Sequence, residues 1–252
     1  MLLPNPSTQY DELCIRAKNL PAFTLSLLEE TERFELLASV GELGPDPSSR
    51  HFTKRTKNIA FVFSERGNWF QIAQNFFNQA VYYNSFSGGY KRYYRELPRE
   101  FLQCQVTQKI LSQFQKIYEI PENELILVQV QTSHVYPGDE NKCLTGQGIH
   151  SDGADKAMLI CLKRENIDGA RNAIYADRQG KKAVLSPFVL QAGDALFWKD
   201  NTVYHYVESA RARSEWGGTR TVLLAHYPAI YYLNGRVNPN NRLIVDPRSI
   251  SL

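Results

Sequence analysis

After Pro121 the sequence is a series of short apolar runs, and this pattern restricts the fold more than any other feature. Turn-favouring pairs such as Pro137-Gly138, Asp168-Gly169 and Gly217-Gly218 separate the runs. Short runs at this spacing are typical of an antiparallel sandwich or a jelly roll and not of βαβ units. Seven runs are predicted to be strands: residues 125–135, 157–162, 172–176, 183–190, 195–199, 202–208 and 220–227.

The first 120 residues are predicted to be mainly helical. Apolar residues recur at helical spacing over residues 9–41, where Pro21 is expected to separate two helices, and over residues 98–118. Residues 58–63 are predicted to be a strand, and residues 69–78 have no clear pattern. Because the front helices need a sheet to cover, we expect residues 1–252 to form a single domain. Residues 1–120 would be mainly a helical cover and residues 121–252 mainly jelly-roll strands.

Composition excludes several classes of protein. Of the 252 residues, 43% are hydrophobic and 22% charged, which is ordinary for a globular chain. The net charge of +3 is too even to indicate a nucleic-acid or membrane partner, and no apolar run is long enough to span a bilayer. The first residues lack the pattern of a secretory signal. Four cysteines without a C-x-x-C pair argue against a zinc ribbon or a disulfide scaffold, and they favour the cytoplasm. Homo-oligomerisation is left open.

A candidate metal site is formed by His150, Asp152 and His205. On an extended strand His150 and Asp152 would point to one face, and His205 lies in a later predicted strand. Two histidines and one carboxylate are the ligand set of non-haem Fe(II) oxygenases, and they leave metal positions open for substrate and O₂. The alternatives are a surface turn in which Asp152 caps Gly153, and a structural ion pair.

Arg220 begins the last apolar run. An arginine in a strand that is otherwise apolar is costly unless it meets an anion, and its planar guanidinium suits a carboxylate. A small dicarboxylate that bridges the metal and Arg220 would account for all four residues. The alternative is a salt bridge at the strand edge near Gly217.

In order and spacing these residues resemble the 2-oxoglutarate/Fe(II)-dependent dioxygenase superfamily, and most closely its bacterial branch of isoleucine dioxygenase-like, free amino-acid hydroxylases. The resemblance covers the chain from about Tyr82 onward. It implies an α+β fold with a double-stranded β-helix (jelly-roll) core covered by N-terminal helices. The matching features are Gln131, His150-Ser151-Asp152, the glycine–asparagine segment 169–176, His205, Arg220, and upstream Tyr83-Asn84 with residues 88–92.

The resemblance implies Fe(II), 2-oxoglutarate and O₂ as cofactor and cosubstrates. His150, Asp152 and His205 would bind the metal, and Arg220 the far carboxylate of 2-oxoglutarate. Relatives with Arg-x-Ser have a second contact to that carboxylate, but Thr221 and Val222 follow here, so Gln131 or Thr219 are the candidates. Because the carboxylate of Asp152 is present, hydroxylation is favoured over halogenation.

The expected substrate is a free amino acid or a similar small polar metabolite. Arg92 is expected to bind its carboxylate, with Tyr90 and Asn172 as further candidates, while Arg50 and Arg55 are weaker candidates for the role of Arg92. The aromatic and basic stretch at residues 82–95 also fits nucleic-acid binding. Alkylated-base demethylases, however, have a second arginine where this chain has His226, and no nucleic-acid partner is expected. His226, His134 and His51 are interpreted as structural or surface residues.

Other functions remain as alternatives. The same oxygenase chemistry could act on a peptide, a carrier-bound amino acid or a natural-product scaffold. A non-catalytic sensor that binds metal and 2-oxoglutarate, and a cupin-like zinc or manganese enzyme, use similar ligands.

Overall fold

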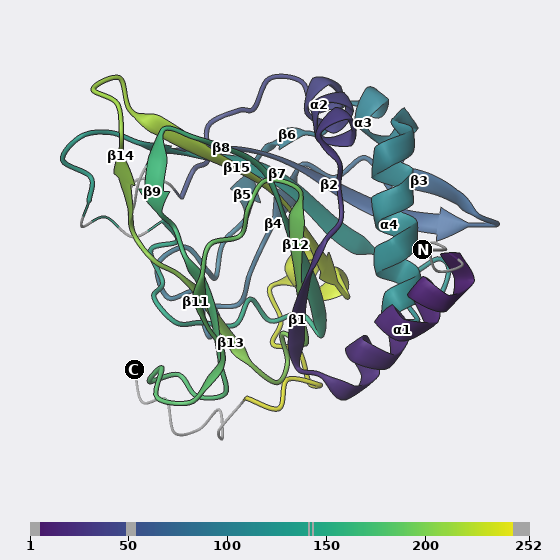
Figure 1. The fold of residues 1–252 in the computed structure, drawn as a ribbon. Helices are drawn as coiled ribbons and strands as arrows, with labels where there is room; N and C mark the ends of the chain where they lie inside the picture. The colour runs from purple at the N-terminus through teal and green to yellow at the C-terminus, as the bar shows by residue number, and fades with distance from the viewer. Residues whose placement is uncertain (1–5, 49–53, 141, 143, 244–252) are drawn as a thin grey trace.

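The computed structural model describes residues 6–48, 54–140, 142 and 144–243, and Figure 1 shows their course. The helices are α1 (Pro6–Asn19), α2 (Glu30–Ser39), α3 (Arg99–Gln103), α4 (Gln105–Ile117) and α5 (Ile230–Asn234). The strands are β1 (Ala22–Ser26), β2 (Arg55–Glu65), β3 (Asn68–Ile72), β4 (Phe76–Phe77), β5 (Arg92–Tyr93), β6 (Arg95–Glu96), β7 (Ile126–Val135), β8 (Lys156–Glu165), β9 (Ile167–Gly169), β10 (Asn172–Tyr175), β11 (Ala183–Phe188), β12 (Asp194–Trp198), β13 (Tyr204–Val207), β14 (Ala210–Ala212) and β15 (Gly218–Tyr227).

One large sheet organises the molecule. Its strands lie in the order β1-β12-β8-β15-β7-β2-β3, with antiparallel neighbours throughout, and the short β6 pairs with β2 in parallel. The long strands β7, β8 and β15 pair over nearly their whole length, so their register is fixed by many hydrogen bonds. This rigid surface is the platform on which the polar residues described below are placed.

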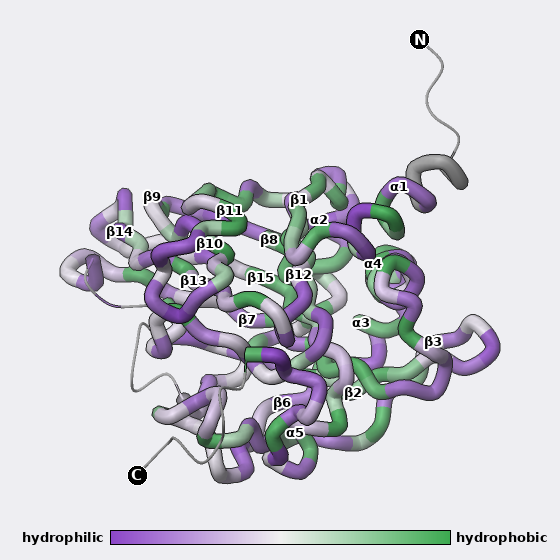
Figure 2. The backbone as a smooth tube through the Cα atoms, turned by 90° about the horizontal axis from the view of Figure 1, so that it is seen from below, coloured by the Kyte–Doolittle hydropathy of each residue, from purple (hydrophilic) through white to green (hydrophobic). Residues whose placement is uncertain are grey.

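The smaller sheets lie across from this platform. β11, β10 and β13 form a three-stranded sheet, β14 pairs with β9, and β4 pairs with β5. Figures 1 and 2 show β11 and β13 on one side of the large sheet and α1, α3 and α4 on the other. Residues from both sheets line one cavity, among them Arg220 and Leu224 of β15, and Asn172 and His205 of the smaller sheet.

The main apolar core lies between the large sheet and helix α4. The helix buries one face, which carries Val106, Ile110, Leu111, Phe114 and Ile117. These side chains share one cluster with strand residues such as Val128 and Ile160. A helix of this length is only marginally stable on its own. Packing of its apolar face against the sheet provides the stabilisation that it needs.

The seven strands predicted after Pro121 are all present, with ends that differ by a few residues. The two short strands β9 and β14 were not predicted, because three residues carry too little periodicity. The predicted helix over 98–118 is divided into α3 and α4 at Cys104, whose backbone is extended.

The prediction of a mainly helical front half is only partly right. β1, β2 and β3 belong to the large sheet, and the segment 22–26, expected within a helix, pairs with β12. Phe23 of β1 stacks on Phe197 of β12 at a centroid distance of 5.2 Å. The next helix begins only after Glu29, whose backbone N–H donates to the Glu32 carboxylate over 3.0 Å. A partner strand distant in sequence therefore outweighs the local leucine spacing.

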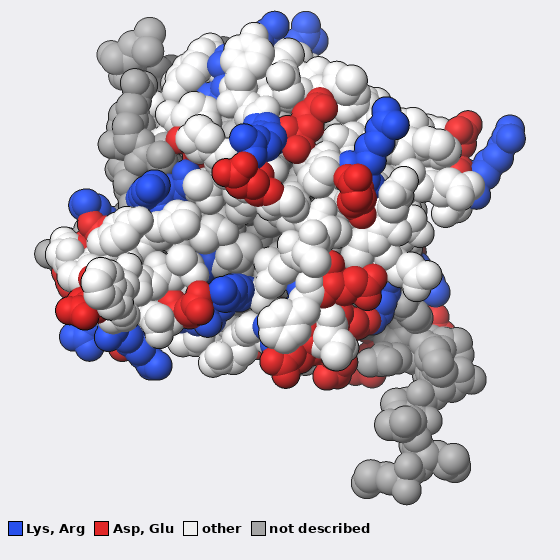
Figure 3. Space-filling view, turned by 90° about the horizontal axis from the view of Figure 1, so that it is seen from above, with Lys and Arg blue, Asp and Glu red and all other residues white. Residues whose placement is uncertain are grey.

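Charges on the surface are mixed in sign. On the face shown in Figure 3, basic and acidic side chains lie interspersed, in keeping with the small net charge. Within the described ranges, every helix is too short or too polar to cross a bilayer.

Candidate functional site

His150 and His205 lie next to each other through their backbones. The N–H of His150 donates to the carbonyl of His205 over 3.0 Å, and the reverse hydrogen bond is 2.8 Å long. This pair forms an isolated bridge at the start of β13, and the two imidazole centroids are 4.2 Å apart. Only His150 is paired, Ser151 and Asp152 lie outside the strands, and the chain bends at Gly153.

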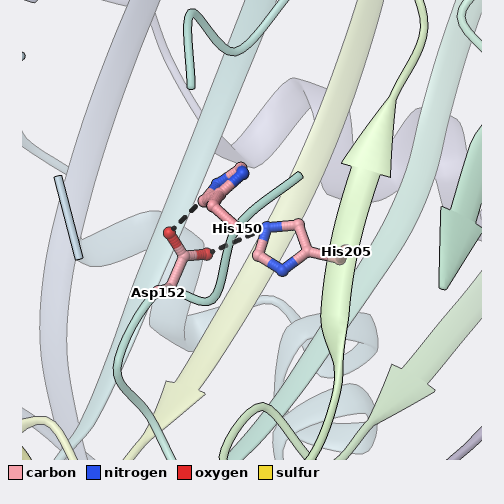
Figure 4. A group of neighbouring side chains, drawn as sticks. All are labelled: His150, Asp152 and His205. Carbon is pink, nitrogen blue, oxygen red and sulfur yellow. Dashed lines mark ion pairs between the residues drawn. The ribbon is translucent and has the colours of Figure 1, made fainter. Parts of the chain in front are cut away.

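Asp152 completes a group of three ligand-type side chains. Its Oδ1 lies 3.6 Å from His150 Nε2 and its Oδ2 lies 3.4 Å from His205 Nε2. One ligand atom from each residue lies within 4.8 Å of the others, and Figure 4 shows the three side chains turned toward one another. Two imidazole nitrogens and one carboxylate oxygen at this spacing fit a single divalent transition metal.

The groups that face Nδ1 favour, in both histidines, the tautomer with the lone pair on Nε2. Nδ1 of His150 donates to the Gly148 carbonyl over 2.9 Å. Nδ1 of His205 faces Oδ1 of Asp200 at 3.4 Å. A polar partner on Nδ1 orients the ring and leaves the Nε2 lone pair for a metal.

Asp200 is a functional residue that the sequence analysis missed. It is fully buried, and its Oδ2 accepts hydrogen bonds from Ser151 Oγ and from the backbone N–H groups of Gly153 and Ala154, at 2.8–3.0 Å. Its Oδ1 accepts from Trp198 Nε1 and faces His205. A single carboxylate therefore holds the turn that carries Asp152 and also the ring of His205.

Two further side chains hold the Asp152 carboxylate. His226 Nε2 lies 3.0 Å from Oδ2, and Gln79 Nε2 lies 3.4 Å from Oδ1 and donates to the Asp152 carbonyl over 2.9 Å. His226, interpreted above as structural, is buried but is part of the site. A signal for it was available, because it lies six residues after Arg220 in an alternating strand and so on the same face.

The three ligand-type residues influence one another electrostatically. Burial raises the pKa of Asp152, but the neighbouring His205, His150 and His226 outweigh it, and the pKa lies well below its usual range. Burial lowers the pKa of His205, but the carboxylates of Asp152 and Asp200 outweigh it and raise the pKa. The site therefore keeps an ionised carboxylate, as a metal ligand must be.

Arg220 lines the same cavity and is almost fully buried, with 5% exposure. It donates to Asn172 Oδ1 over 3.1 Å, and its Nε has no partner. Among the described residues, no acidic side chain forms an ion pair with Arg220. A buried guanidinium in this state is suited to a carboxylate brought in by a ligand.

Of the other residues predicted to act near Arg220, some line the same cavity and one does not. Gln131 lines the cavity. Thr219 does not, because it alternates with Arg220 along β15 and belongs to the other face of the strand. Asn172 lines the cavity, but its carbonyl oxygen is used by Arg220 and not left for a substrate.

The residues predicted upstream to contact the substrate fall into two groups, those that line the cavity and those that do not. Arg92 is buried in the cavity wall, with 4% exposure, and Arg55 lies there too. Tyr90, by contrast, is exposed and does not line the cavity. Arg50 and His51 lie outside the described residues. His134 lies beside Thr56 and outside the cavity wall.

The residues present fit an iron and 2-oxoglutarate pair. The donor set of His150, Asp152 and His205 suits Fe(II) on one side of the ion, and the unpartnered Nε of Arg220 suits a carboxylate in the same cavity. The empty volume of this cavity, counted out to its open mouth, is about 970 Å³.

Comparison with known proteins agrees with this geometry. The family model described as "2OG-Fe dioxygenase" matches residues 38–226, which is 189 of the 252 residues. The match includes the three ligand-type residues and Arg220. None of the curated proteins compared with the chain matches it.

Several solved structures share the fold. A BsmA homologue from Methylobium petroleophilum PM1 superposes with a TM-score of 0.69 at 16% identity, covering 86% of this chain and 92% of the other. IDO from Bacillus thuringiensis superposes with a TM-score of 0.68 at 13% identity, covering 90% and 97%. A prolyl-4-hydroxylase from Pseudomonas putida has a TM-score of 0.51 at 11% identity, covering 87% and 99%. At such identities the likeness concerns the fold.

Proposed function

The chain belongs to the 2OG-Fe dioxygenase family, and on that premise we propose that it hydroxylates an unactivated C–H bond of a free L-amino acid or a similar small polar metabolite. Enzymes of this family use Fe(II), 2-oxoglutarate and O₂. The observation that carries the proposal is the convergence of His150, Asp152 and His205 in a cavity that also holds the buried Arg220.

Each of these residues has a distinct task. His150, Asp152 and His205 would hold Fe(II) from one side and leave its other positions for 2-oxoglutarate and O₂. Arg220 would bind the far carboxylate of 2-oxoglutarate, and Asn172 fixes the guanidinium for that contact. Gln131 is kept as the second contact to that carboxylate because it shares the cavity, whereas Thr219 is set aside.

When bound, Fe(II) and 2-oxoglutarate supply the oxidation: with O₂ they convert a C–H bond to C–OH as 2-oxoglutarate becomes succinate and CO₂. The work of this chain is to position the reactants and exclude water. Leu159, Leu196 and Leu224 provide apolar wall beside the ligands. An apolar wall strengthens the electrostatic contacts within the site and protects the reaction from solvent.

We further propose that the two facing sheets form a double-stranded β-helix (jelly-roll) within a single domain covering residues 1–252. The cavity between the large sheet and the β11-β10-β13 sheet supports this assignment. The pairing of β2 with β7 joins the front and back halves of the chain in one sheet. The free cysteines Cys14, Cys104 and Cys161 are in keeping with a reducing compartment, which we take to be the cytoplasm.

The test is a direct assay of both products. Purified protein is incubated with Fe(II), ascorbate, 2-oxoglutarate and a panel of amino acids, and succinate and a product heavier by one oxygen atom are measured by mass spectrometry. We expect both to appear in equal amounts with at least one substrate, and neither with Asp152→Ala. Activity with zinc and none with iron would contradict the assignment.

A further inference from the structure

A second group of basic side chains lies in the cavity wall, apart from Arg220. It consists of Arg55 and Lys57 of β2 and Arg92 of β5, and we call it the basic cluster. All three are at least 90% buried. Burying positive charge is costly unless anions compensate it, so the compensation has to be identified.

One acidic residue, Asp46, pairs with two members of the cluster. The carboxylate of Asp46 contacts Arg55 Nε at 2.6 Å and Lys57 Nζ at 3.6 Å. Burial lowers the pKa of Lys57 to about 7, and the positive charges of Arg55 and Arg92 contribute to this shift. Arg55 is paired with Asp46 and Lys57 is partly neutral near pH 7, so the charge of the cluster that lacks an acidic partner is that of Arg92.

Arg92 is the member of the cluster without an acidic partner. Its terminal nitrogen donates to Gln79 Oε1 over 3.2 Å, its guanidinium lies 4.5 Å from the ring centroid of Phe77, and its Nε has no partner. Neither the amide nor the ring neutralises its charge. A planar guanidinium with a free N–H is suited to a carboxylate.

The cluster lies beside the candidate metal site but away from Arg220. Gln79 contacts both Arg92 and Asp152, so Arg92 is one side chain away from the ligand set. Arg55 and Arg220 are paired with opposite sides of Ser133, which places their Cα atoms about 10 Å apart, at two strand spacings. A 2-oxoglutarate anchored on Arg220 therefore leaves the basic cluster for a second molecule.

The cavity offers that second molecule no negative charge. Among the described residues that line the cavity, the one acidic side chain is Asp152, a candidate metal ligand. An ammonium group of a substrate would thus meet only neutral acceptors such as Gln129 and Gln131. The wall therefore distinguishes between the two ends of an amino acid.

We infer that the primary substrate is a small carboxylic acid, whose carboxylate is bound by Arg92 and Lys57 and whose recognition needs no charged amine. An amino acid is then recognised through its carboxylate, and the analogue that lacks the amino group binds at least as tightly. The assignment rests on the proposed function, because it names the substrate class of the same site.

Binding without turnover tests this assignment. The anaerobic complex with Fe(II) is saturated with N-oxalylglycine, an analogue of 2-oxoglutarate that cannot be decarboxylated, so that Arg220 and the metal are occupied. Calorimetry then compares matched sets of four to six carbons: the carboxylate, the corresponding 2-amino acid and the carboxamide. We expect the carboxylate to bind at least as tightly as the amino acid, because the ammonium finds no anionic partner in this cavity. The carboxamide should bind at least about 30-fold more weakly.

Variants locate the contact. Arg92→Gln should weaken carboxylate binding by about 30-fold or more, and Arg92→Lys should weaken it less. Arg95→Gln is the matched control, because Arg95 is an exposed arginine of the neighbouring strand β6 that pairs with Glu42. If Arg92→Gln fails to fold, the comparison of carboxylate with carboxamide in the unaltered protein still decides whether the site requires a carboxylate.

Three results would overturn the assignment: equal binding of carboxylate and carboxamide, a requirement for the amino group, or no binding by any member of the sets. The proposed function stands apart from this test, because it depends on succinate and product formation. Turnover with a substrate that lacks a carboxylate would refute the substrate class and leave the oxygenase assignment intact.

Discussion

Asp152 and His226 are joined by a hydrogen bond of 3.0 Å between Oδ2 and Nε2, although 74 residues separate them. Because an ionised carboxylate only accepts, His226 donates from Nε2, and its Nδ1 accepts from the amide of Gln129 over 3.3 Å. The carbonyl of Gln129 in turn accepts from Lys57 Nζ over 3.0 Å. Every donor in this chain of hydrogen bonds points toward Asp152, so the basic cluster and the candidate metal site are connected.

Replacing His226 should weaken metal binding while leaving the ligands in place. His226→Leu removes the donor to Asp152, and we expect the dissociation constant of Fe(II) to rise about 10- to 100-fold. His226→Gln, which retains an N–H donor, should recover part of that loss. Anaerobic calorimetric titration with Fe(II) measures both, with the urea midpoint as the check of folding. Unchanged affinity in His226→Leu would show that Asp152 needs no such support.

Asp200→Asn should destabilise the turn that carries Asp152. The variant places an amide where one oxygen accepts three hydrogen bonds, so the free energy of unfolding should fall by about 1–3 kcal/mol. Asp177→Asn is a matched control, because Asp177 also accepts from three backbone N–H groups but lies on the surface. We expect the control to change stability by less than about 0.5 kcal/mol. Urea denaturation compares the two, and equal losses would contradict a special role for Asp200.

Arg220→Gln should affect 2-oxoglutarate and not the metal. Losing a charge-assisted contact to a buried carboxylate raises the dissociation constant of 2-oxoglutarate by about 30-fold or more. The affinity for Fe(II) should stay the same, because Arg220 contacts Asn172 and none of the metal-ligand candidates. Arg213→Gln, at a surface arginine paired with Asp168, is the control. A variant that loses affinity for the primary substrate alone would refute this role.

Lys57 should make stability depend on pH. Its folded-state pKa of about 7 lies below the ordinary value of 10.5, so the unfolded chain holds a proton that the folded protein releases between these values. The free energy of unfolding therefore rises with pH across this window, by up to about 1.4 kcal/mol per pH unit. Lys57→Met should lose this slope, whereas Lys163→Met, at an exposed lysine, should keep it. Urea denaturation in a chelator between pH 7.5 and 9.5 measures the difference, and parallel profiles would contradict the lowered pKa.

The residues that the sequence singled out for the metal converge in one cavity, but not for the geometric reason given. Alternation along a strand was expected to place His150 beside Asp152. The two side chains do lie together, but Asp152 is outside any strand, and Asp200 holds the bend that follows it. The order and spacing of residues in the sequence identify the side chains that could bind a metal. They do not reveal a carboxylate that reaches the turn from a position 48 residues farther along the chain.

Two members of the basic cluster, Arg92 and Arg55, were predicted from the sequence as candidates for the substrate carboxylate, whereas Lys57 was not. Lys57 lies in a polar stretch at the start of β2, between Thr56 and Asn58, and resembles a surface residue. Only the pairing of β2 with β7 places Lys57 against Gln129, and only the short β4-β5 ladder brings Arg92 over Phe77. Such contacts depend on tertiary packing, which local periodicity does not encode.

The pairing of β1 with β12 has a practical consequence for anyone who shortens the chain. A fragment that begins at Ala38, where the family match starts, would lack residues 22–26 and leave one side of β12 without its hydrogen-bond partner. A bare strand next to the apolar surface of Phe197 is a template for uncontrolled self-association. Truncation guided by the family boundary would thus favour aggregation of the fragment.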